Sequence, residues 1–316
     1  MKRFLSAILA GILLPVVCYG VTIDPKFSID PASPAINGNI TSDDVLRAGP
    51  TVLTQGRDLG LQDDFFSGFY DNLDALSYGK DPIVRPVYFS VDRVAVGLPG
   101  SAVYEYAQPG VESAHGNIYQ SLPPSGSNVL FRDGTSLGLT PGFFGDDLNA
   151  LELDTPPSFP VYFSIDFLSA SNGFGSGHLA ADILMSMGNG SFDIFRDHTT
   201  MGLLAEDDID ALVLDVAHNI ALFSLSTFSP TTFTGSGNPY NPLGGSGFVS
   251  PADIFYTEFD GTFKPWASAA ELGLRPDDEL NALDTVVPEP GTFVLVTGGG
   301  IILLGWAKRK NRNWKS

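Results

Sequence analysis

The stretch at residues 160–166 reads PVYFSID, and residues 86–92 read PVYFSVD. Both are short runs of β-branched and aromatic residues behind a proline, and such runs are typical of β-strands. Their Phe-Ser-x-Asp portion occurs again at residues 27–30, and a degenerate form, Phe-Ser-Leu-Ser, occurs at residues 223–226. The chain therefore carries one strand pattern four times.

Each copy continues with three further landmarks in a constant order. Asp or Asn followed by two apolar residues occurs at 44–46, 117–119, 182–184 and 253–255. Leu-Gly-Leu, with Met for the first leucine in the third copy, occurs at 59–61, 137–139, 201–203 and 272–274. Leu/Ile-Asp/Asn-Ala-Leu occurs at 73–76, 148–151, 209–212 and 280–283. This order indicates a fourfold internal repeat with a period of roughly 60–75 residues. Its units lie at about 27–76, 89–151, 163–212 and 223–283.

Each unit contains several predicted strands. In the third and fourth units, second and third strands joined by turns that contain glycine are expected at 181–186, 192–195, 252–256 and 262–263. Residues 207–215 fit either a one-turn helix or a fourth strand, because apolar residues recur there at both periods.

Three or four short strands per unit, four units and no long helical pattern predict a mostly β chain. The arrangement we expect is a four-bladed β-propeller-like domain at residues 21–287. Two β-sandwiches are the alternative, and a stacked β-solenoid comes third because its rungs should be shorter and more regular. Asp74-Ala75 precedes Tyr88-Phe89, which is faintly similar to hemopexin-type four-bladed propellers. The spacing here is longer and the disulfide that closes those domains is absent, so the similarity is an analogy.

The first twenty residues have the form of a secretory signal peptide. Lys2 and Arg3 precede an apolar run that ends at Cys18, and the small residue Gly20 stands at the exit. Cys18 is the one cysteine of the chain. Removing residues 1–20 therefore leaves a body without disulfides, cysteine-ligated zinc or thiol catalysis.

The last thirty residues have three parts. Pro288, Glu289 and Pro290 come first, and an uncharged run of about 17 residues follows. The end of the chain is basic, with Lys308, Arg309, Lys310, Arg312 and Lys315. The uncharged run predicts a transmembrane helix over residues 292–307, at the short end of the usual length. The basic residues after it stop transfer and keep that end in the cytoplasm.

This order of motif, span and basic end resembles the C-terminal sorting signal of PEP-CTERM proteins, over residues 288–316. The resemblance implies an exported Gram-negative bacterial protein that is anchored transiently in the inner membrane. It further implies that an exosortase recognises the tail and cuts it near Pro288-Glu289-Pro290, which leaves the product at the cell surface or outside the cell. A plain C-terminal membrane anchor is the alternative. The resemblance covers about a tenth of the chain and implies nothing about the fold of the body.

The charge of the body excludes some partners. Two of the 17 basic residues lie in the leader and five in the tail, whereas one of the 36 acidic residues lies in the tail, so residues 21–287 carry a net charge of about −25. Such a charge repels nucleic-acid phosphates and argues against binding of DNA or RNA. It leaves carboxylates available for divalent cations. A composition of 43% hydrophobic and 11% aromatic residues is sufficient for a folded core.

The recurring acidic landmarks are the one candidate site. An acidic pair precedes the fourth landmark in copies two to four, at Asp146, Asp147, Asp207, Asp208, Asp277 and Asp278. Calcium takes six to eight oxygen ligands, so these carboxylates are candidate Ca²⁺ ligands, and no other cofactor is indicated. The alternative is that they cap turns by accepting backbone N–H groups. The first and second landmarks also contain an aspartate. Ser226 replaces it in one copy of the first landmark and Asn117 in one copy of the second, which argues against a strict ligand role at these two positions.

Two classes of function remain. The first is a non-enzymatic exported module with a structural or binding role in the extracellular matrix or biofilm. Its partners are exosortase and, by the resemblance, exopolysaccharide. The second is an extracellular hydrolase or lyase that acts on polysaccharide with a pair of carboxylates. An enzyme should have one repeat with an unmatched carboxylate pair, whereas a scaffold should keep its acids at equivalent positions. The sequence is closer to the scaffold, since no catalytic motif or histidine cluster accompanies the acids.

Overall fold

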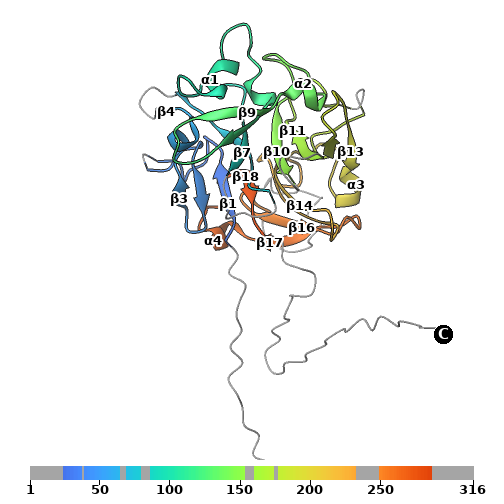
Figure 1. The fold of residues 1–316 in the computed structure, drawn as a ribbon. Helices are drawn as coiled ribbons and strands as arrows, with labels where there is room; N and C mark the ends of the chain where they lie inside the picture. Colours follow the sequence, from blue (N-terminus) through green and yellow to red (C-terminus); the bar gives the residue numbers. More distant parts are fainter. Residues whose placement is uncertain are drawn as a thin grey trace, which may run out of the picture.

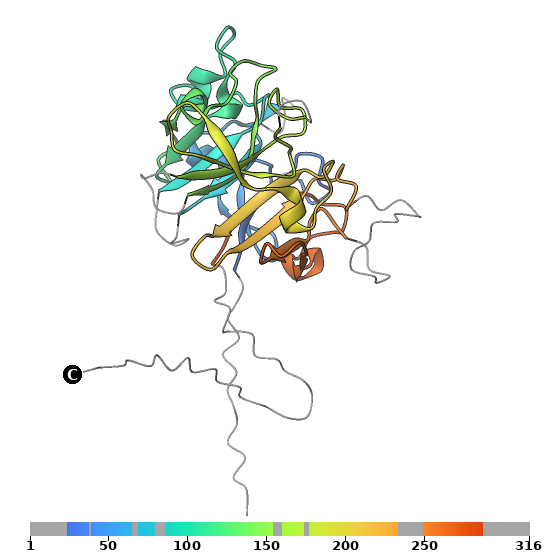
Figure 2. The same cartoon turned by 90° about the vertical axis from the view of Figure 1, so that its right-hand side faces the viewer.

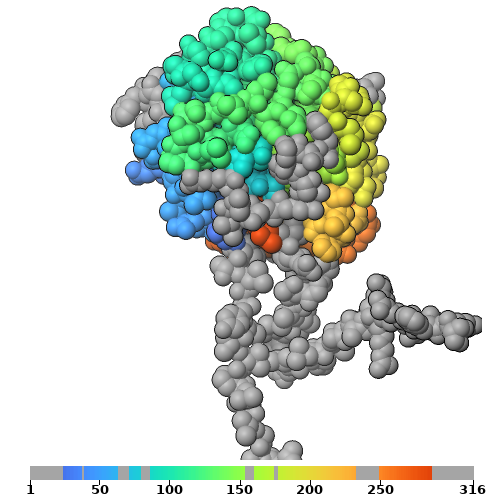
Figure 3. Space-filling view, viewed as in Figure 1, coloured from blue at the N-terminus to red at the C-terminus, as the bar shows by residue number. Residues whose placement is uncertain are grey.

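The computed structural model describes residues 24–37, 39–64, 69–79, 86–153, 160–173, 177–232 and 249–286. Within these ranges the chain forms four antiparallel sheets of four strands each. Figure 1 shows the sheets as four blades around a common centre, and the space-filling view from the same side shows the blades in contact around it (Figure 3). Figure 2 shows the third and fourth blades from the side. The predicted mostly-β, four-bladed propeller arrangement is confirmed.

The strands of each blade are given from the centre outward. Blade 1 contains β18 (Leu280–Asp284), β1 (Lys26–Ile29), β2 (Val45–Arg47) and β3 (Thr51–Thr54). Blade 2 contains β6 (Leu73–Ser77), β7 (Val87–Val91), β8 (Ile118–Ser121) and β9 (Asn128–Arg132). Blade 3 contains β10 (Leu148–Leu153), β11 (Val161–Ile165), β12 (Ile183–Ser186) and β13 (Phe192–Arg196). Blade 4 contains β14 (Ile209–Asp215), β15 (Ile220–Leu225), β16 (Ile254–Thr257) and β17 (Lys264–Ala267).

Short helices follow the outer strand of each blade. They are η1 (Gly56–Leu59), α2 (Gly134–Leu137), α3 (His198–Met201) and α4 (Ala269–Leu272). Blade 2 also carries α1 (Ala102–Tyr106) and η2 (Ala114–Gly116) between its second and third strands, and β4 (Asp63–Asp64) pairs with β5 (Phe69–Tyr70) before β6. Residues 207–215 contain the strand β14, so the strand alternative for that stretch is correct.

The sequence repeat and the blade differ in phase by one strand. Each repeat unit supplies the three outer strands of one blade and then the inner strand of the next blade, because its last landmark forms β6, β10, β14 or β18. The last unit therefore ends in β18, which pairs with β1 and completes blade 1. The first and last described strands close the ring.

The second and third landmarks hold adjacent parts of the fold together. In every blade the Asp or Asn of the second landmark accepts the first amide of the short helix. The four bonds are Gly56 N to Asp44 Oδ1, Gly134 N to Asn117 Oδ1, His198 N to Asp182 Oδ1 and Ala269 N to Asp253 Oδ1, at 2.8–3.0 Å. Asn117 therefore does the same work as the aspartates. A glycine amide in each outer hairpin then donates to the helix of the preceding blade, for example Gly190 N to Ser136 O at 2.8 Å.

The hydrophobic core lies between the blades. Each of the four core clusters combines buried side chains of two adjacent blades; one joins Phe27 and Leu46 of blade 1 to Leu222 and Ile254 of blade 4. The serine of the first landmark adds an inter-blade bond at three of the junctions, since Ser28 Oγ donates to Leu73 O at 2.7 Å, and equivalent bonds come from Ser164 and Ser224. Several of the repeated residues therefore make contacts that join adjacent blades.

Both predicted end segments lie outside the described residues: the signal peptide at 1–20, and the sorting signal at 288–316 with Pro288, Glu289, Pro290, Lys308, Arg309, Lys310 and Arg312. Within the part of the chain that the structure describes, no helix is long and apolar enough to cross a membrane.

Candidate functional site

The starts of the four inner strands meet at one end of the central axis, and we call this end the mouth. Neighbouring inner strands β6, β10, β14 and β18 pack against one another around the axis. Their starts are joined by side chains, since Asn281 Nδ2 donates to Asp74 Oδ1 at 3.0 Å and Asn149 Nδ2 donates to Asp210 Oδ1 at 2.8 Å. The ends of the inner strands, including Asp284 of β18, lie away from the mouth.

A β-bulge recurs at the start of every inner strand. Pairing with the neighbouring strand skips the second residue of each, so this residue is freed from the ladder. The skipped residues are Asp74, Asn149, Asp210 and Asn281. Around the axis they alternate between Asp and Asn, and each Asn amide donates to the carboxyl of one bulged Asp. This order keeps carboxylates of adjacent inner strands from facing each other at the bulge.

Two further sets of equivalent positions contribute to the mouth. The residues directly before the inner strands are Asn72, Asp147, Asp208 and Glu279. The residues directly after the second strands are Asp30, Asp92, Asp166 and Ser226, and the side chain of each accepts the backbone amide two positions later. With the bulged residues these sets bring eight carboxyl groups together: Asp30, Asp74, Asp92, Asp147, Asp166, Asp208, Asp210 and Glu279.

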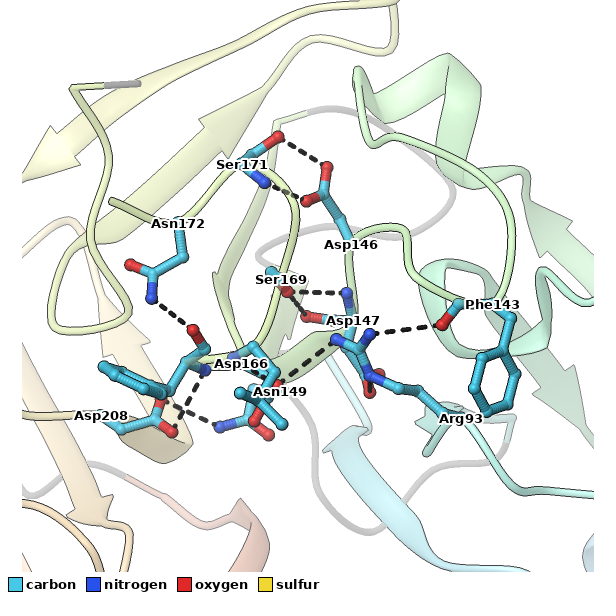
Figure 4. A network of polar contacts seen from close by, with 12 residues as sticks. Arg93, Phe143, Asp146, Asp147, Asn149, Asp166, Ser169, Ser171, Asn172 and Asp208 are labelled. Atoms are coloured by element: carbon cyan, nitrogen blue, oxygen red, sulfur yellow. Dashed lines mark hydrogen bonds and ion pairs between the residues drawn. The ribbon is translucent and has the colours of Figure 1, made fainter. Parts of the chain in front are cut away.

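Arg93 is the cation of this cluster. Its Nε lies 3.0 Å from Asp147 Oδ2, and a terminal nitrogen lies 3.4 Å from Asp166 Oδ1. A second terminal nitrogen donates to Phe143 O at 3.3 Å. Figure 4 shows the guanidinium turned toward Asp147 and Asp166, at the junction of blades 2 and 3. Within the described residues, these two ion pairs are the ones that the eight carboxyls make.

Burial and repulsion between carboxyls raise the pKa values of Asp92, Asp74 and five other mouth residues. Burial raises the pKa of Asp92 to about 7, although its turn amides oppose the shift. Burial first, and then repulsion from Asp147, Asp92, Asp166 and Asp30, raises the pKa of Asp74. Burial is also the main cause of the raised pKa values of Asp30, Asp147, Asp208, Asp210 and Glu279. These carboxyls therefore hold their protons to a higher pH than free carboxyls, and the repulsion between them is relieved by a proton or by another positive charge.

The six predicted calcium ligands divide into two groups. Asp146, Asp207 and Asp278 accept backbone amides of nearby loops, as when Thr140 N donates to Asp146 Oδ2 at 2.7 Å and Arg275 N donates to Asp278 Oδ2 at 2.7 Å. Figure 4 shows Asp146 turned toward Ser171, whereas the adjacent Asp147 is turned toward Arg93. These three residues have the turn-capping contacts that were the alternative to metal binding.

The other three predicted ligands do not form one set. Asp147 and Asp208 lie at the mouth, whereas Asp277 is exposed and pairs with Arg275 at 2.9 Å. The equivalent mouth position in the fourth copy is Glu279, so the pair in that copy is shifted by one residue. Among the described residues, no group of three or more His, Cys, Asp and Glu side chains could hold a metal ion. Calcium at the predicted aspartates stays a prediction.

Several mouth residues were not predicted. The alternation of Asp and Asn in the fourth landmark was visible in the sequence, and it is the signal that could have identified Asn149 and Asn281. Glu279 follows from aligning the copies on that landmark. Arg93 stands one position after the turn aspartate, where the other copies have Pro31, Phe167 and Thr227. Nothing in a single copy distinguishes it from a surface arginine.

The fold and site define a class: a four-bladed propeller arrangement of repeated units with an acidic mouth at one end of its axis. Comparisons with protein-family models and with curated proteins found no match to this chain. Its function is therefore argued from the sequence and the geometry.

Proposed function

We propose that this chain is an exported protein that an exosortase sorts and cleaves. Its propeller body then acts without enzymatic activity, as a structural or binding module at the cell surface or in the extracellular matrix, including biofilm. The tail at residues 288–316, with its Pro-Glu-Pro motif, uncharged run and basic end, is the observation that carries this proposal. Exosortase and exopolysaccharide are the partners it implies.

The position of the tail supports the proposal. The closing strand β18 ends at Asp284, four residues before Pro288. A cut near the motif therefore leaves all sixteen strands of the four sheets in the released part of the chain. Asp284 also lies at the end of the inner strands away from the mouth. A body held by its tail consequently has its mouth directed away from the point of attachment.

The distribution of acids supports a non-enzymatic role. The mouth carboxyls come from equivalent positions of the repeat, with Asp147, Asp208 and Glu279 directly before the inner strands. An enzyme acting through a carboxylate pair requires one acid and one base in distinct surroundings. Here the three acids occupy equivalent positions and share one direction of pKa shift, although only Asp147 is paired with Arg93. This pattern fits a symmetric module better than it fits a hydrolase.

The test is intact-mass spectrometry of the protein recovered from its own host, with and without exosortase. We expect a mass that ends near Pro288 in the wild-type host and a mass that includes residues 291–316 in the exosortase-deficient host. An intact tail in both hosts would make the protein a plain membrane-anchored one. Depolymerisation of an exopolysaccharide by the purified protein at a useful rate would overturn the non-enzymatic role.

A further inference from the structure

Exposed apolar side chains surround the acidic mouth. The turns that end the second strands of blades 2, 3 and 4 each present one at the same position: Val94, Leu168 and Phe228. Leu168 is 72% exposed and Phe228 is 85% exposed. The loop before Asp146 adds Phe144, which is 84% exposed and contacts Phe143 edge to face at 5.1 Å. Exposed apolar groups beside a charged cluster can contact a ligand that the charge attracts.

Positive charge at the mouth is distributed unevenly. Arg93 serves Asp147 and Asp166 at the junction of blades 2 and 3. On the other side of the axis, Asp208 repels Asp210 and Glu279, which share a hydrogen bond with each other, and no described Lys or Arg forms an ion pair with these three residues. The guanidinium of Arg93 thus neutralises one side of the mouth. The other side has no equivalent Lys or Arg among the described residues.

Two buried oxygen atoms at the mouth have no hydrogen-bond donor in the described chain. They are Oδ1 of Asn72 and Oδ1 of Asp147, and both residues are 4% exposed. The other polar atoms of these side chains are engaged, since Asn72 Nδ2 donates to Asp74 and Asp147 Oδ2 accepts from Arg93. A buried acceptor without a donor costs about 1–3 kcal/mol, so a bound N–H group at these atoms is favourable.

These three observations restrict the chemistry of a ligand. The carboxyl excess favours a cation, the lone acceptors favour hydrogen-bond donors, and the exposed apolar side chains at the rim favour apolar groups beside the charge. A bare metal ion does not use the rim. An amino sugar carries its nitrogen directly on a bulky ring, and the ring is too wide to bring that nitrogen to a buried acceptor. A lysine or arginine side chain has a slender apolar stem and several donors, and its neighbours along a polypeptide can cover the rim.

We propose that the mouth is a docking site for a polypeptide segment of a partner protein in which a lysine or arginine is flanked by apolar residues. The cationic side chain enters along the axis, among the four equivalent residues Asn72, Asp147, Asp208 and Glu279 that directly precede the inner strands. The flanking residues pack on Phe144, Leu168 and Phe228. The inference rests on the proposed function only in treating the body as a binding module. Its test does not depend on processing of the tail.

The test uses the full chain in phosphatidylcholine nanodiscs, with empty nanodiscs as a blank. The probe is a fluorescein-labelled peptide, acetyl-Gly-Phe-Lys-Leu-Gly-amide, and its partner peptide has Glu in place of Lys. Fluorescence anisotropy at pH 8 should show binding of the Lys peptide that is at least about tenfold tighter than that of the Glu peptide. Raising NaCl should weaken it severalfold, because partly exposed charges are screened.

Matched variants locate the binding surface. Glu279→Gln removes the charge but keeps an acceptor for Thr227 N, and Phe228→Ser changes a side chain that is almost fully exposed. Each should weaken binding at least about fivefold. Met187→Ser is the control, because Met187 is 54% exposed on the β12–β13 hairpin, at the end of β12 away from the mouth loops. It should leave binding unchanged.

Three outcomes would overturn the proposal. The first is equal binding of the Lys and Glu peptides. The second is an equal loss in Met187→Ser and Phe228→Ser, which would mean nonspecific adhesion. The third is binding of a fully de-N-acetylated glucosamine hexamer at the mouth without binding of the peptide, which would assign the surface to a glycan. Exosortase processing could still occur in each case, so the two proposals fail separately.

Discussion

Lys26 and Asp284 lie directly opposite each other in the antiparallel pair β1–β18. The pairing joins the first described strand to the last one and closes the ring of blades. The carboxylate of Asp284 also accepts the amide of Tyr78 in blade 2 at 2.6 Å. One residue of the closing strand therefore pairs with the first described strand in its own blade and contacts the next blade around the axis.

Removal of the closing strand should prevent folding of the ring. A chain that ends at residue 279 lacks Leu280, Ala282 and Leu283, all buried, and leaves β1 without its inner partner. We expect it to lose the cooperative thermal transition seen by circular dichroism. A chain that ends at residue 287 keeps every described strand and should unfold like the full body. Equal transitions in the two truncations would show that β18 is dispensable.

Replacing a glycine at the contact between blades by alanine should destabilise the protein more than replacing a glycine of the same conformation that has open space around its Cα. Gly138 has a φ of 97°, and a Cβ there would lie 2.6 Å from the Cα of Ser191 in the next blade. Gly142 has a φ of 99° and no atom within 4 Å of that position. Gly142→Ala should cost about 1–2 kcal/mol from the left-handed backbone alone. Gly138→Ala should cost at least about 2 kcal/mol more in urea unfolding, because backbone must move. Equal losses would contradict this contact.

The sequence predicted the number of blades but not where each one begins. Four landmarks in a constant order, each on a strand, a turn or a helix end, were sufficient to predict four repeated β units. The landmark at 280–283 belongs to the last unit in sequence and to blade 1 in space. Pairing between the first and last strands is a long-range contact, and a local pattern contains no information about it.

The candidate site was predicted only in part, because which side chains meet at the mouth also depends on strand pairing that the sequence does not show. Aspartate was treated as one kind of residue, although Asp146 accepts loop amides and its neighbour Asp147 lies at the mouth. Adjacent residues in an extended chain point to opposite sides, so a pair of acids is seldom a pair of ligands. The bulge that turns Asn149 and Asp210 toward each other depends on pairing with the next strand. It was therefore not visible in the sequence.

Stability should rise on mild acidification. Burial raises the pKa of Asp284 to about 7, against the opposing effects of the Tyr78 amide and Lys26. An unfolded chain releases this proton near its ordinary pKa of 3.8. Between these pH values the folded state binds more protons than the unfolded state, so the free energy of unfolding falls as pH rises from about 4 to about 7. The raised pKa values at the mouth act in the same direction. Urea unfolding should show greater stability at pH 5 than at pH 8.

The variant Asp284→Asn isolates one part of this effect. Asparagine keeps an acceptor for Tyr78 N and carries no charge at any pH. We expect it to stabilise the protein at pH 8 by about 2 kcal/mol, within the limit that a shift of about three pKa units sets. At pH 5 it should change the stability little. A destabilised variant at pH 8 would show that the electrostatic attraction of Lys26 outweighs the burial of the carboxylate.

The alternation of Asp and Asn at the bulges should be required at neutral pH. Asn149 Nδ2 donates to Asp210 Oδ1, to Asp208 Oδ1 at 3.3 Å and to Ile209 O at 3.1 Å, so it joins two acids and a carbonyl. Asn149→Asp replaces those donors with a third carboxyl in a half-buried position, where like charges repel strongly. We expect a loss of at least about 2 kcal/mol at pH 8, measured by urea unfolding. The loss should shrink at pH 5, because protonation of the cluster restores a donor and removes charge. Asn189→Asp, on the exposed β12–β13 hairpin, is the matched control and should change the stability by less than about 0.5 kcal/mol at either pH. A loss in Asn149→Asp that is the same at both pH values would mean that shape, rather than charge, maintains the alternation.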